Sequence, residues 1–412
     1  MNLLIKFIKI VTLLQLSSLP IMLHGEPGKR IVCSFPNWAI YRTKSGGAVQ
    51  YTVDNIDPTM CTHVLYSFAL LDKSTFKIAI KDQLVDIENQ GYSKSVALKT
   101  QNPQLKVMIS LGGWADANDG SKKYAALIGN DSNIDTFVSS VMDFLQLHHF
   151  DGLDLDYDYI PNAVVKTSFA RLLVALSTAF SPKGYLLSLA LPAAPSDYSS
   201  SIGGDYDVSS LNENVNFTNL RTFYFHGSWE PTVADHHSPL LKRPWEQTNN
   251  LNANFAVTYW TNLGLLASKI NLGIPLFGLS WTLPRSLSSD SFIPPAIAEK
   301  VGPSEAKMAF FEICSSVRKK GWEVFQDPSQ RIGPYAVSPT DPKTWVGYDD
   351  PAMAIVKSQF ILSKGLGGAF LWDISNDDFK DICGLGVNPI TTAIYHTLNG
   401  LNTTCDCVCY DN

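Results

Sequence analysis

Short apolar runs rich in β-branched residues recur along this chain, and between them lie stretches with apolar residues at helical spacing, such as 134–148 and 165–179. The predicted strands are 31–35, 63–68, 106–111, 152–157, 185–191, 216–225, 269–276 and 367–372. Eight alternations of strand and helix predict an α/β fold, a (β/α)8 TIM barrel, that occupies one long domain at 29–398.

One interval does not follow this alternation of strand and helix. The spacing between Trp281 and Tyr348 is too long for a single crossover between neighbouring strands. It contains two short runs, 322–325 and 331–337, that favour antiparallel strands. The sequence therefore predicts additional structure between the seventh and eighth barrel strands.

The first 23 residues carry early lysines followed by two short apolar stretches, which Gln15, Ser17, Ser18 and Pro20 interrupt. This pattern predicts a secretory signal peptide at 1–25, cut between about 18 and 28. A membrane anchor is the weaker alternative because the apolar run is short and broken, and no later segment approaches about 18 uninterrupted apolar residues. We expect a secreted, extracellular protein without a membrane span.

The composition indicates a well-buried globular protein, with 412 residues of which 45% are hydrophobic and 17% are charged. A formal net charge of −6 argues against a nucleic-acid partner held by bulk electrostatics. The sequence contains no Gly-rich phosphate loop, so no cofactor is predicted. The histidine pairs 148–149 and 236–237 lack neighbours that would complete a zinc site, and we predict that they are surface residues with no metal.

Seven cysteines fit an exported protein, although sequence alone leaves their connectivity open. Three of them, Cys405, Cys407 and Cys409, lie in a Cys-rich tail at 399–412. The tail leaves an odd thiol, which suggests either a disulfide-linked partner or a truncated module. Sequons for N-glycosylation begin at Asn130, Asn216 and Asn402.

Acidic residues gather in one apolar run, at Asp151, Asp154, Asp156 and Asp158. The run ends at Pro161 and predicts a buried strand, on which the last three carboxylates share one face because side chains alternate. Like charges on one buried face repel each other and lose hydration, so a structural role does not call for them. A metal site or a set of helix caps is the alternative to a catalytic centre.

The segment 151–158 resembles the signature of the family-18 glycoside hydrolases, the chitinases, which runs Asp-Gly-x-Asp-x-Asp-x-Glu. Asp158 stands where the family has its proton-donating Glu. The resemblance extends from 31 to about 398 and implies a TIM barrel with a small α+β insertion domain, here 282–348, between strands 7 and 8. It also implies two disulfides, Cys33–Cys61 and Cys314–Cys383.

Family members cleave with help from the substrate, whose own acetamido oxygen attacks the anomeric carbon. The resemblance implies that Asp156 orients this acetamido group, with Asp154 preceding it in the signature. A Tyr and an Asp in a Met-x-Tyr-Asp motif on strand six also hold the group. This chain has Arg221, Phe223 and Tyr224 in place of Met, Tyr and Asp, and the following His-Gly-Ser-Trp fixes the register.

These departures predict little or no hydrolysis. An Asp at 158 withdraws the carboxyl from the leaving oxygen by about 1.5 Å. A displacement of about 1 Å can cost on the order of a hundredfold in rate, and loss of a general acid on the order of 10² to 10⁴. Loss of the Tyr hydroxyl at 223 removes a transition-state hydrogen bond worth roughly a few kcal/mol.

Arg221 supports a second hypothesis about the same centre. If 221 and 223 share a strand face, Arg221 points inward and its guanidinium lies near Asp156 or Asp158, which favours the ionised carboxylates and offsets their burial. The alternative is an arginine whose charged end reaches out to solvent from the strand end.

The aromatic positions that bind sugar in the family are better retained. The resemblance assigns ligand-binding roles to Tyr66, Phe68, Trp114, Phe223, Tyr224 and Trp372, and Trp38 and Trp229 are further candidates. Flat apolar rings suit the C–H faces of pyranoses. Two positions on strand seven depart from the family, with Phe277 in place of Tyr and Leu279 in place of Arg.

Three functions follow from this sequence. The first is a chitinase-like protein that binds chitin or chito-oligosaccharide without cleaving it. The second is a weakly active chitinase in which Asp158 donates the proton. The third is a secreted growth-factor-like or immune-modulating ligand whose barrel surface contacts a protein receptor.

Overall fold

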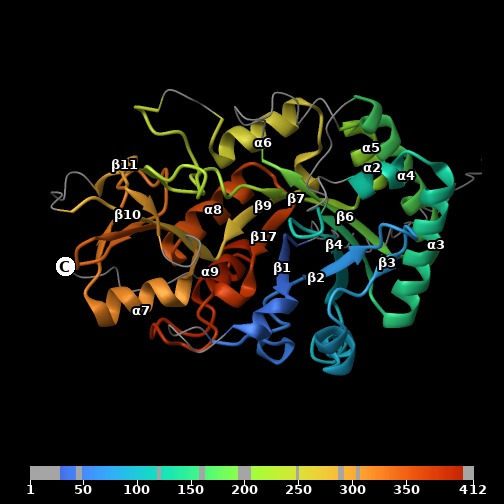
Figure 1. The fold of residues 1–412 in the computed structure, drawn as a ribbon, viewed down its shortest axis with the longest axis horizontal. Helices are drawn as coiled ribbons and strands as arrows, with labels where there is room; N and C mark the ends of the chain where they lie inside the picture. The colour runs from blue at the N-terminus through green and yellow to red at the C-terminus, as the bar shows by residue number, and fades with distance from the viewer. Residues whose placement is uncertain are drawn as a thin grey trace, which may run out of the picture.

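Eight parallel strands close into a barrel at the centre of the molecule (Figure 1). They are β1 Arg30–Pro36, β2 His63–Leu71, β4 Lys106–Gly112, β5 Gly152–Asp156, β6 Leu186–Pro192, β7 Phe217–Arg221, β9 Ile270–Pro275 and β17 Gly368–Trp372. Each strand pairs with the next, and β1 pairs with both β17 and β2, which closes the barrel. The predicted TIM barrel is confirmed.

The computed structural model describes part of the chain. The described residues are 28–42, 49–117, 122–156, 163–193, 206–246, 250–285, 292–302 and 307–401. Several predictions lie outside them: the signal peptide 1–25, Asp158, the sequon at Asn402 and the tail thiols Cys405, Cys407 and Cys409.

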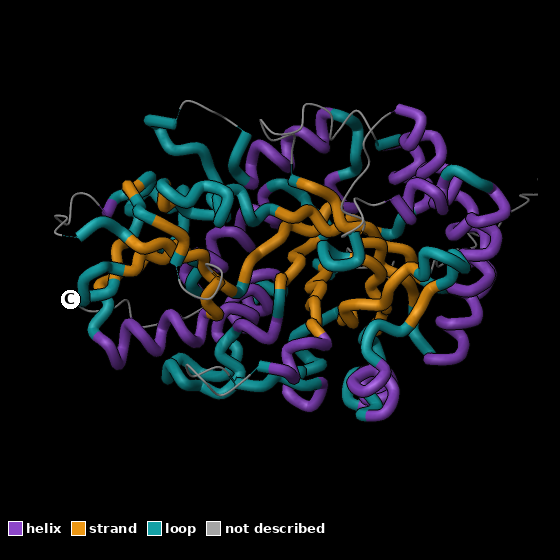
Figure 2. Tube along the Cα trace, in the orientation of Figure 1, coloured by secondary structure: helices purple, strands orange, loops and turns teal. Residues whose placement is uncertain are grey.

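Helices surround the barrel (Figure 2). They are α1 Gly91–Ala97, α2 Lys122–Ile128, α3 Asp131–His148, α4 Ala163–Phe180, α5 Val208–Asn214, α6 Ala253–Asn262, α8 Pro351–Ser363 and α9 Pro389–Leu398. Helix α3 begins before the predicted 134 because Asn130 caps it, accepting the N–H of Ser132 at 2.9 Å. Among the described helices, none is both long and apolar enough to cross a membrane.

A second, antiparallel sheet lies between β9 and β17 in the chain and beside the barrel in space (Figure 1). Its strands follow the order β12 Lys300–Val301, β10 Phe277–Thr282, β16 Thr344–Gly347, β15 Tyr335–Val337 and β14 Glu323–Phe325, and β13 Lys307–Ala309 also pairs with β10. Helix α7 Phe310–Lys320 follows β13 directly. Short strands complete the structure: β3 Ile78–Ala79 pairs with β2, and β8 Val233–Ala234 pairs with β11 Ala296–Ile297.

Side chains inside the barrel form an apolar layer and a polar layer. The apolar layer contains Val32, Leu65, Met108, Phe217 and Phe370. The polar layer contains Ser34, Ser67, Ser110, Asp154, Ser188, Asn219 and Asn271, all buried. Because side chains alternate along each strand, the positions between these layers face the surrounding helices.

Both predicted disulfides are present. Cys33 pairs with Cys61 at a Cα–Cα distance of 6.0 Å, and Cys314 pairs with Cys383 at 5.8 Å. The first ties β1 to the segment before β2, and the second ties α7 to the segment after β17.

Two sequence predictions about local structure are wrong. The sixth strand ends at Arg221 and not at 225, because Thr222 N–H turns back to Leu220 O at 2.9 Å and Tyr224 adopts a φ of 60°. His236 and His237 are fully buried rather than on the surface, since the segment after β8 packs against β10 and the end of β16. Their Nε2 atoms contact the carbonyls of Tyr348 and Phe277, at 2.9 and 3.1 Å respectively.

Candidate functional site

A cavity of about 580 Å³ lies at the carboxyl ends of the barrel strands, where TIM barrels carry their active sites. We call it the aromatic cleft. Its lining residues are Trp38, Phe68, Lys81, Gly113, Trp114, Ala115, Asp156, Arg221, Phe223, Tyr224, Phe370 and Trp372. The barrel strands β2, β5, β7 and β17 and the loops after β1, β3, β4 and β7 therefore supply this surface.

Three rings form a continuous aromatic surface in the cleft. Trp38 stacks on Phe68 with ring centroids 5.7 Å apart, and Trp372 lies 6.0 Å from Phe68. Phe68 reaches the cleft because the register of β2 against β4 shifts between Ser67 and Ala69. Trp114 also lines the cleft and is 80% exposed, so its ring is available to a ligand.

Tyr66 does not line the aromatic cleft, contrary to its predicted place among the sugar-contacting residues. Its neighbours Leu65 and Ser67 face the barrel interior, so Tyr66 faces the outer helices and is fully buried. Its hydroxyl donates to Asp86 Oδ1 at 2.7 Å, and its ring packs against Tyr92 at 5.0 Å. Burial raises the pKa of the Tyr66 hydroxyl, so it serves as a neutral donor in the core.

Asp156 and Arg221 form an ion pair within the cleft. Arg221 Nη1 donates to Asp156 Oδ1 at 3.3 Å, and both side chains are largely buried. This contact confirms that Arg221 points inward toward Asp156. Asp158 lies outside the described residues.

Asp154 lies below the cleft, at the centre of the polar layer. It accepts hydrogen bonds from Ser110 Oγ at 2.7 Å, Ser188 Oγ at 2.5 Å and Asn219 Nδ2 at 3.2 Å. Burial raises the pKa of Asp154, and these donors, together with Arg221, oppose that shift. Asp154 and Asp156 do share a strand face, as predicted, but they differ in depth and in partners.

Phe223 and Tyr224 lie on the turn after β7 and both line the cleft. Phe223 is 5% exposed and packs on Phe370 at 6.2 Å. The ring of Tyr224 lies 5.2 Å from that of Phe277. Tyr224 is 39% exposed as a residue, but desolvation of its hydroxyl and the charge of Asp373 raise its pKa, a hydrogen bond with Trp372 opposes this, and the phenol stays protonated at neutral pH. The cleft therefore presents a phenyl ring and a phenol here, and no carboxylate.

Lys81 is a lining residue that sequence reasoning missed. Its Nζ lies 4.7 Å from the ring centroid of Trp38 and 5.4 Å from that of Phe68. A single lysine in a loop gives no signal in the sequence, since its position over these rings depends on the folding of two separate loops.

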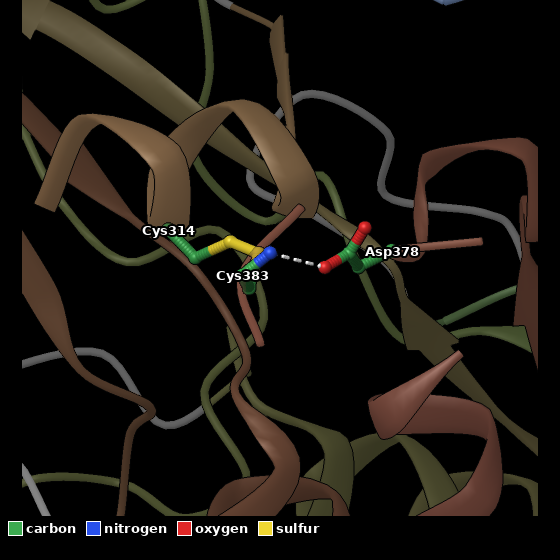
Figure 3. A group of neighbouring side chains, drawn as sticks. All are labelled: Cys314, Asp378 and Cys383. Atoms are coloured by element: carbon green, nitrogen blue, oxygen red, sulfur yellow. Dashed lines mark hydrogen bonds between the residues drawn. A yellow bond between two sulfur atoms is a disulfide. The ribbon is translucent and has the colours of Figure 1, made fainter. Parts of the chain in front are cut away.

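One cluster of potential metal ligands occurs among the described residues: Cys314, Asp378 and Cys383 (Figure 3). The two sulfurs are bonded to each other, so neither is a thiolate available to a metal. Asp378 Oδ2 accepts the backbone N–H of Cys383 at 2.7 Å. The cluster is a disulfide with a carboxylate that fixes its backbone.

Two predicted glycosylation sites lie in described segments. Asn130 and Asn216 are both exposed. Each side chain also accepts a backbone hydrogen bond, from Ser132 at 2.9 Å and from Leu187 at 2.8 Å. Their glycosylation stays a prediction.

Comparison with known proteins agrees with this geometry. The family model "Glycosyl hydrolases family 18" matches residues 30–377. The chain is 35% identical over 392 residues to human chitinase-3-like protein 2, which covers 92% of this chain and 95% of that protein. It is also 35% identical over 381 residues to probable chitinase 10 of Drosophila melanogaster, over 90% of this chain but only 16% of the fly protein's length.

Solved structures share this fold over about nine tenths of the chain. Catalytic domain 2 of the Group II chitinase of Ostrinia furnacalis superposes with a TM-score of 0.82 at 34% identity, over 91% of this chain and 97% of that one. Human YKL-39, a pseudo-chitinase with retained chitooligosaccharide binding properties, gives a TM-score of 0.78 at 33% identity, over 90% and 100%. Barrel and cleft together define a chitinase-like protein. The chain belongs to glycosyl hydrolase family 18.

Proposed function

We propose that this protein is a secreted chitinase-like protein that binds chitin or N-acetylglucosamine oligosaccharides and hydrolyses them little or not at all. The observation that carries this proposal is the ion pair between Arg221 and Asp156 inside an aromatic cleft. Asp156 matches the residue that orients the substrate's acetamido group in the family, and here its carboxylate is held by a guanidinium.

Changes at three further positions also weaken catalysis. Phe223 offers no hydroxyl to the acetamido group, and Tyr224 supplies a protonated phenol where the family has a carboxylate. Asp158 is one methylene shorter than the family's acid. Each change weakens a contact needed in the transition state, whereas the rings of Phe68, Trp114 and Trp372 that would contact bound sugar are retained.

One related protein supports binding without turnover. Human YKL-39, 33% identical, is a pseudo-chitinase that retains chitooligosaccharide binding. The N-terminal pattern at 1–25 and two disulfides fit an exported protein, because disulfides persist in oxidising compartments.

The test measures hydrolysis and binding on the same purified protein. Hydrolysis of a fluorogenic chitotriose is compared with that of Asp158→Ala, and retention on chitin beads is scored in parallel. Retention with turnover no greater than that of Asp158→Ala supports the proposal. Turnover above that control identifies a weakly active chitinase, and absence of both turnover and retention contradicts the proposal and directs attention to a protein receptor.

A further inference from the structure

The charged side chains of the aromatic cleft differ in whether they are paired with each other. Among the described lining residues, the charged ones are Lys81, Asp156 and Arg221. Asp156 is already paired with Arg221 at 3.3 Å. A ligand that enters the cleft therefore meets one carboxylate that is neutralised and an ammonium that is not part of this pair.

Lys81 is held in place by aromatic rings. Its Nζ lies 4.7 Å from the centroid of Trp38 and 5.4 Å from that of Phe68, and these two rings stack on each other. An ammonium over ring faces is attracted by the negative face of the π-system. The side chain is thereby fixed beside the surface on which a sugar ring would stack.

The carboxylates that follow Lys81 along the chain or lie near it are engaged elsewhere. Asp82 accepts from Tyr41 at 2.8 Å. Asp86 is buried and accepts from Asn37 at 2.8 Å and from Tyr66 at 2.7 Å. Asp116 is paired with Lys123 at 2.5 Å. None of the three lines the cleft, so a ligand bound there contacts the ammonium of Lys81 and none of these carboxylates, whose charges help to keep Lys81 protonated by raising its pKa against the effect of burial.

A second carboxylate beside the aromatic rings is also paired with a lysine. Asp373 follows Trp372 directly and is buried, and its Oδ2 is paired with Lys307 Nζ at 3.2 Å. Lys307 Nζ also lies 4.6 Å from the ring centroid of Phe277. Asp156 and Asp373, like Asp116, are therefore each matched by a cation of the chain.

We propose that the aromatic cleft discriminates by charge against deacetylated sugar units, and that Lys81 is the specificity-determining residue. This inference rests on the proposed function. Removal of an acetyl group converts a neutral amide into an ammonium. A glucosamine unit stacked beside Trp38 and Phe68 brings that ammonium close to the ammonium of Lys81, and like charges in a partly desolvated site repel each other. The cleft therefore takes neutral N-acetylated oligosaccharides and rejects glucosamine oligosaccharides.

The test compares two tetrasaccharides, chitotetraose and the glucosamine tetramer, by titration calorimetry at about pH 5.5, where the sugar amines are protonated, and at low ionic strength. The wild type should bind chitotetraose at least about tenfold more tightly than the glucosamine tetramer. Lys81→Met, which keeps an unbranched apolar side chain without charge, should bring this ratio close to one by strengthening the glucosamine complex. Lys81→Arg should restore the ratio, because the positive charge returns.

Two controls sharpen the comparison. Lys73→Met removes an exposed lysine on the β2–β3 turn outside the cleft and should leave the ratio unchanged. Each variant is also measured with Asp158→Asn, so that the charge of Asp158 does not enter the comparison.

Equal binding of the two tetrasaccharides by the wild type, or an unchanged ratio in Lys81→Met, overturns the inference while leaving the proposed function intact. Failure of the wild type to bind chitotetraose overturns the proposed function and, with it, this inference.

Discussion

Lys357 and Asp349 form an ion pair in which both side chains are completely buried. Lys357 Nζ also donates to Ser238 O at 2.8 Å and to Ser238 Oγ at 2.7 Å. Lys357 comes from α8 and Ser238 from the segment after β7, while Asp349 follows the last strand of the antiparallel sheet. The pair therefore fastens the antiparallel sheet to the barrel.

Replacing Lys357 with Met should destabilise the protein by about 3–5 kcal/mol, because a buried carboxylate loses its cation. Burial raises the pKa of Asp349 to about 6 even with Lys357 present. Without the ammonium, Asp349 should hold its proton to still higher pH. The loss of stability of Lys357→Met relative to the wild type should therefore grow as the pH rises from 5 to 8. Urea unfolding at both pH values measures this. Lys319→Met, at an exposed position on α7, is the control and should change stability by less than about 0.5 kcal/mol.

His226 should make stability depend on pH near neutrality. Burial lowers the pKa of His226, but its contacts with Glu230 at 2.9 Å and Asp235 at 3.8 Å outweigh burial and raise the pKa above 6.5. A raised pKa means that the stabilisation is fully present below about 6.5 and is lost as the pH rises through the folded-state value.

His226→Gln should therefore flatten the thermal stability profile between pH 6 and 8, and lower the melting temperature most at the acid end. His149→Asn, at an exposed helix end, should keep the wild-type slope. An unchanged slope in His226→Gln would show that another group titrates.

Catalysis should return only when several residues are restored together. Asp158→Glu alone should raise chitotriose hydrolysis little, because Asp156 stays paired with Arg221 and position 223 lacks its hydroxyl. Adding Arg221→Met, Phe223→Tyr and Tyr224→Asp should raise the rate by at least about 10², since each group acts on the same transition state. A large gain from Asp158→Glu alone would show that the proton donor is the sole defect.

Trp372→Ala should weaken chito-oligosaccharide binding by about tenfold or more, because it removes an aromatic stacking surface of the cleft. Tyr66→Phe, which the structure places outside the cleft, serves as the matched control. It should leave the dissociation constant unchanged while costing about 1–2 kcal/mol of stability through the lost bond to Asp86. Fluorescence titration and denaturant unfolding separate the two effects, and weaker binding by Tyr66→Phe would contradict the assignment of this residue to the core.

Much of the barrel could be predicted because its signals are local. Each of the eight strands is a short apolar run, and every predicted strand overlaps an observed one. The exception in detail is β7, which ends at Arg221 because the turn at 222–224 depends on contacts with β9 and the antiparallel sheet. Thr222 Oγ1 donates to Gly273 O, a residue of β9, at 2.7 Å.

The functional site was likewise predictable from the sequence only in part. Sequence alone determined which residue types occupy the signature, namely Asp158 in place of Glu and Arg221, Phe223 and Tyr224 in place of the strand-six motif. Those identities are fixed by the chain itself. They already predict a weakened catalytic centre.

Only the tertiary structure decided which of these residues meet. The pairing of Arg221 with Asp156, the position of Lys81 over Trp38 and Phe68, and the burial of Tyr66 away from the cleft all join segments far apart in the chain. The physical reason is that alternation and helical spacing specify a face within one element, whereas partners across elements depend on strand register, turn geometry and the packing of loops.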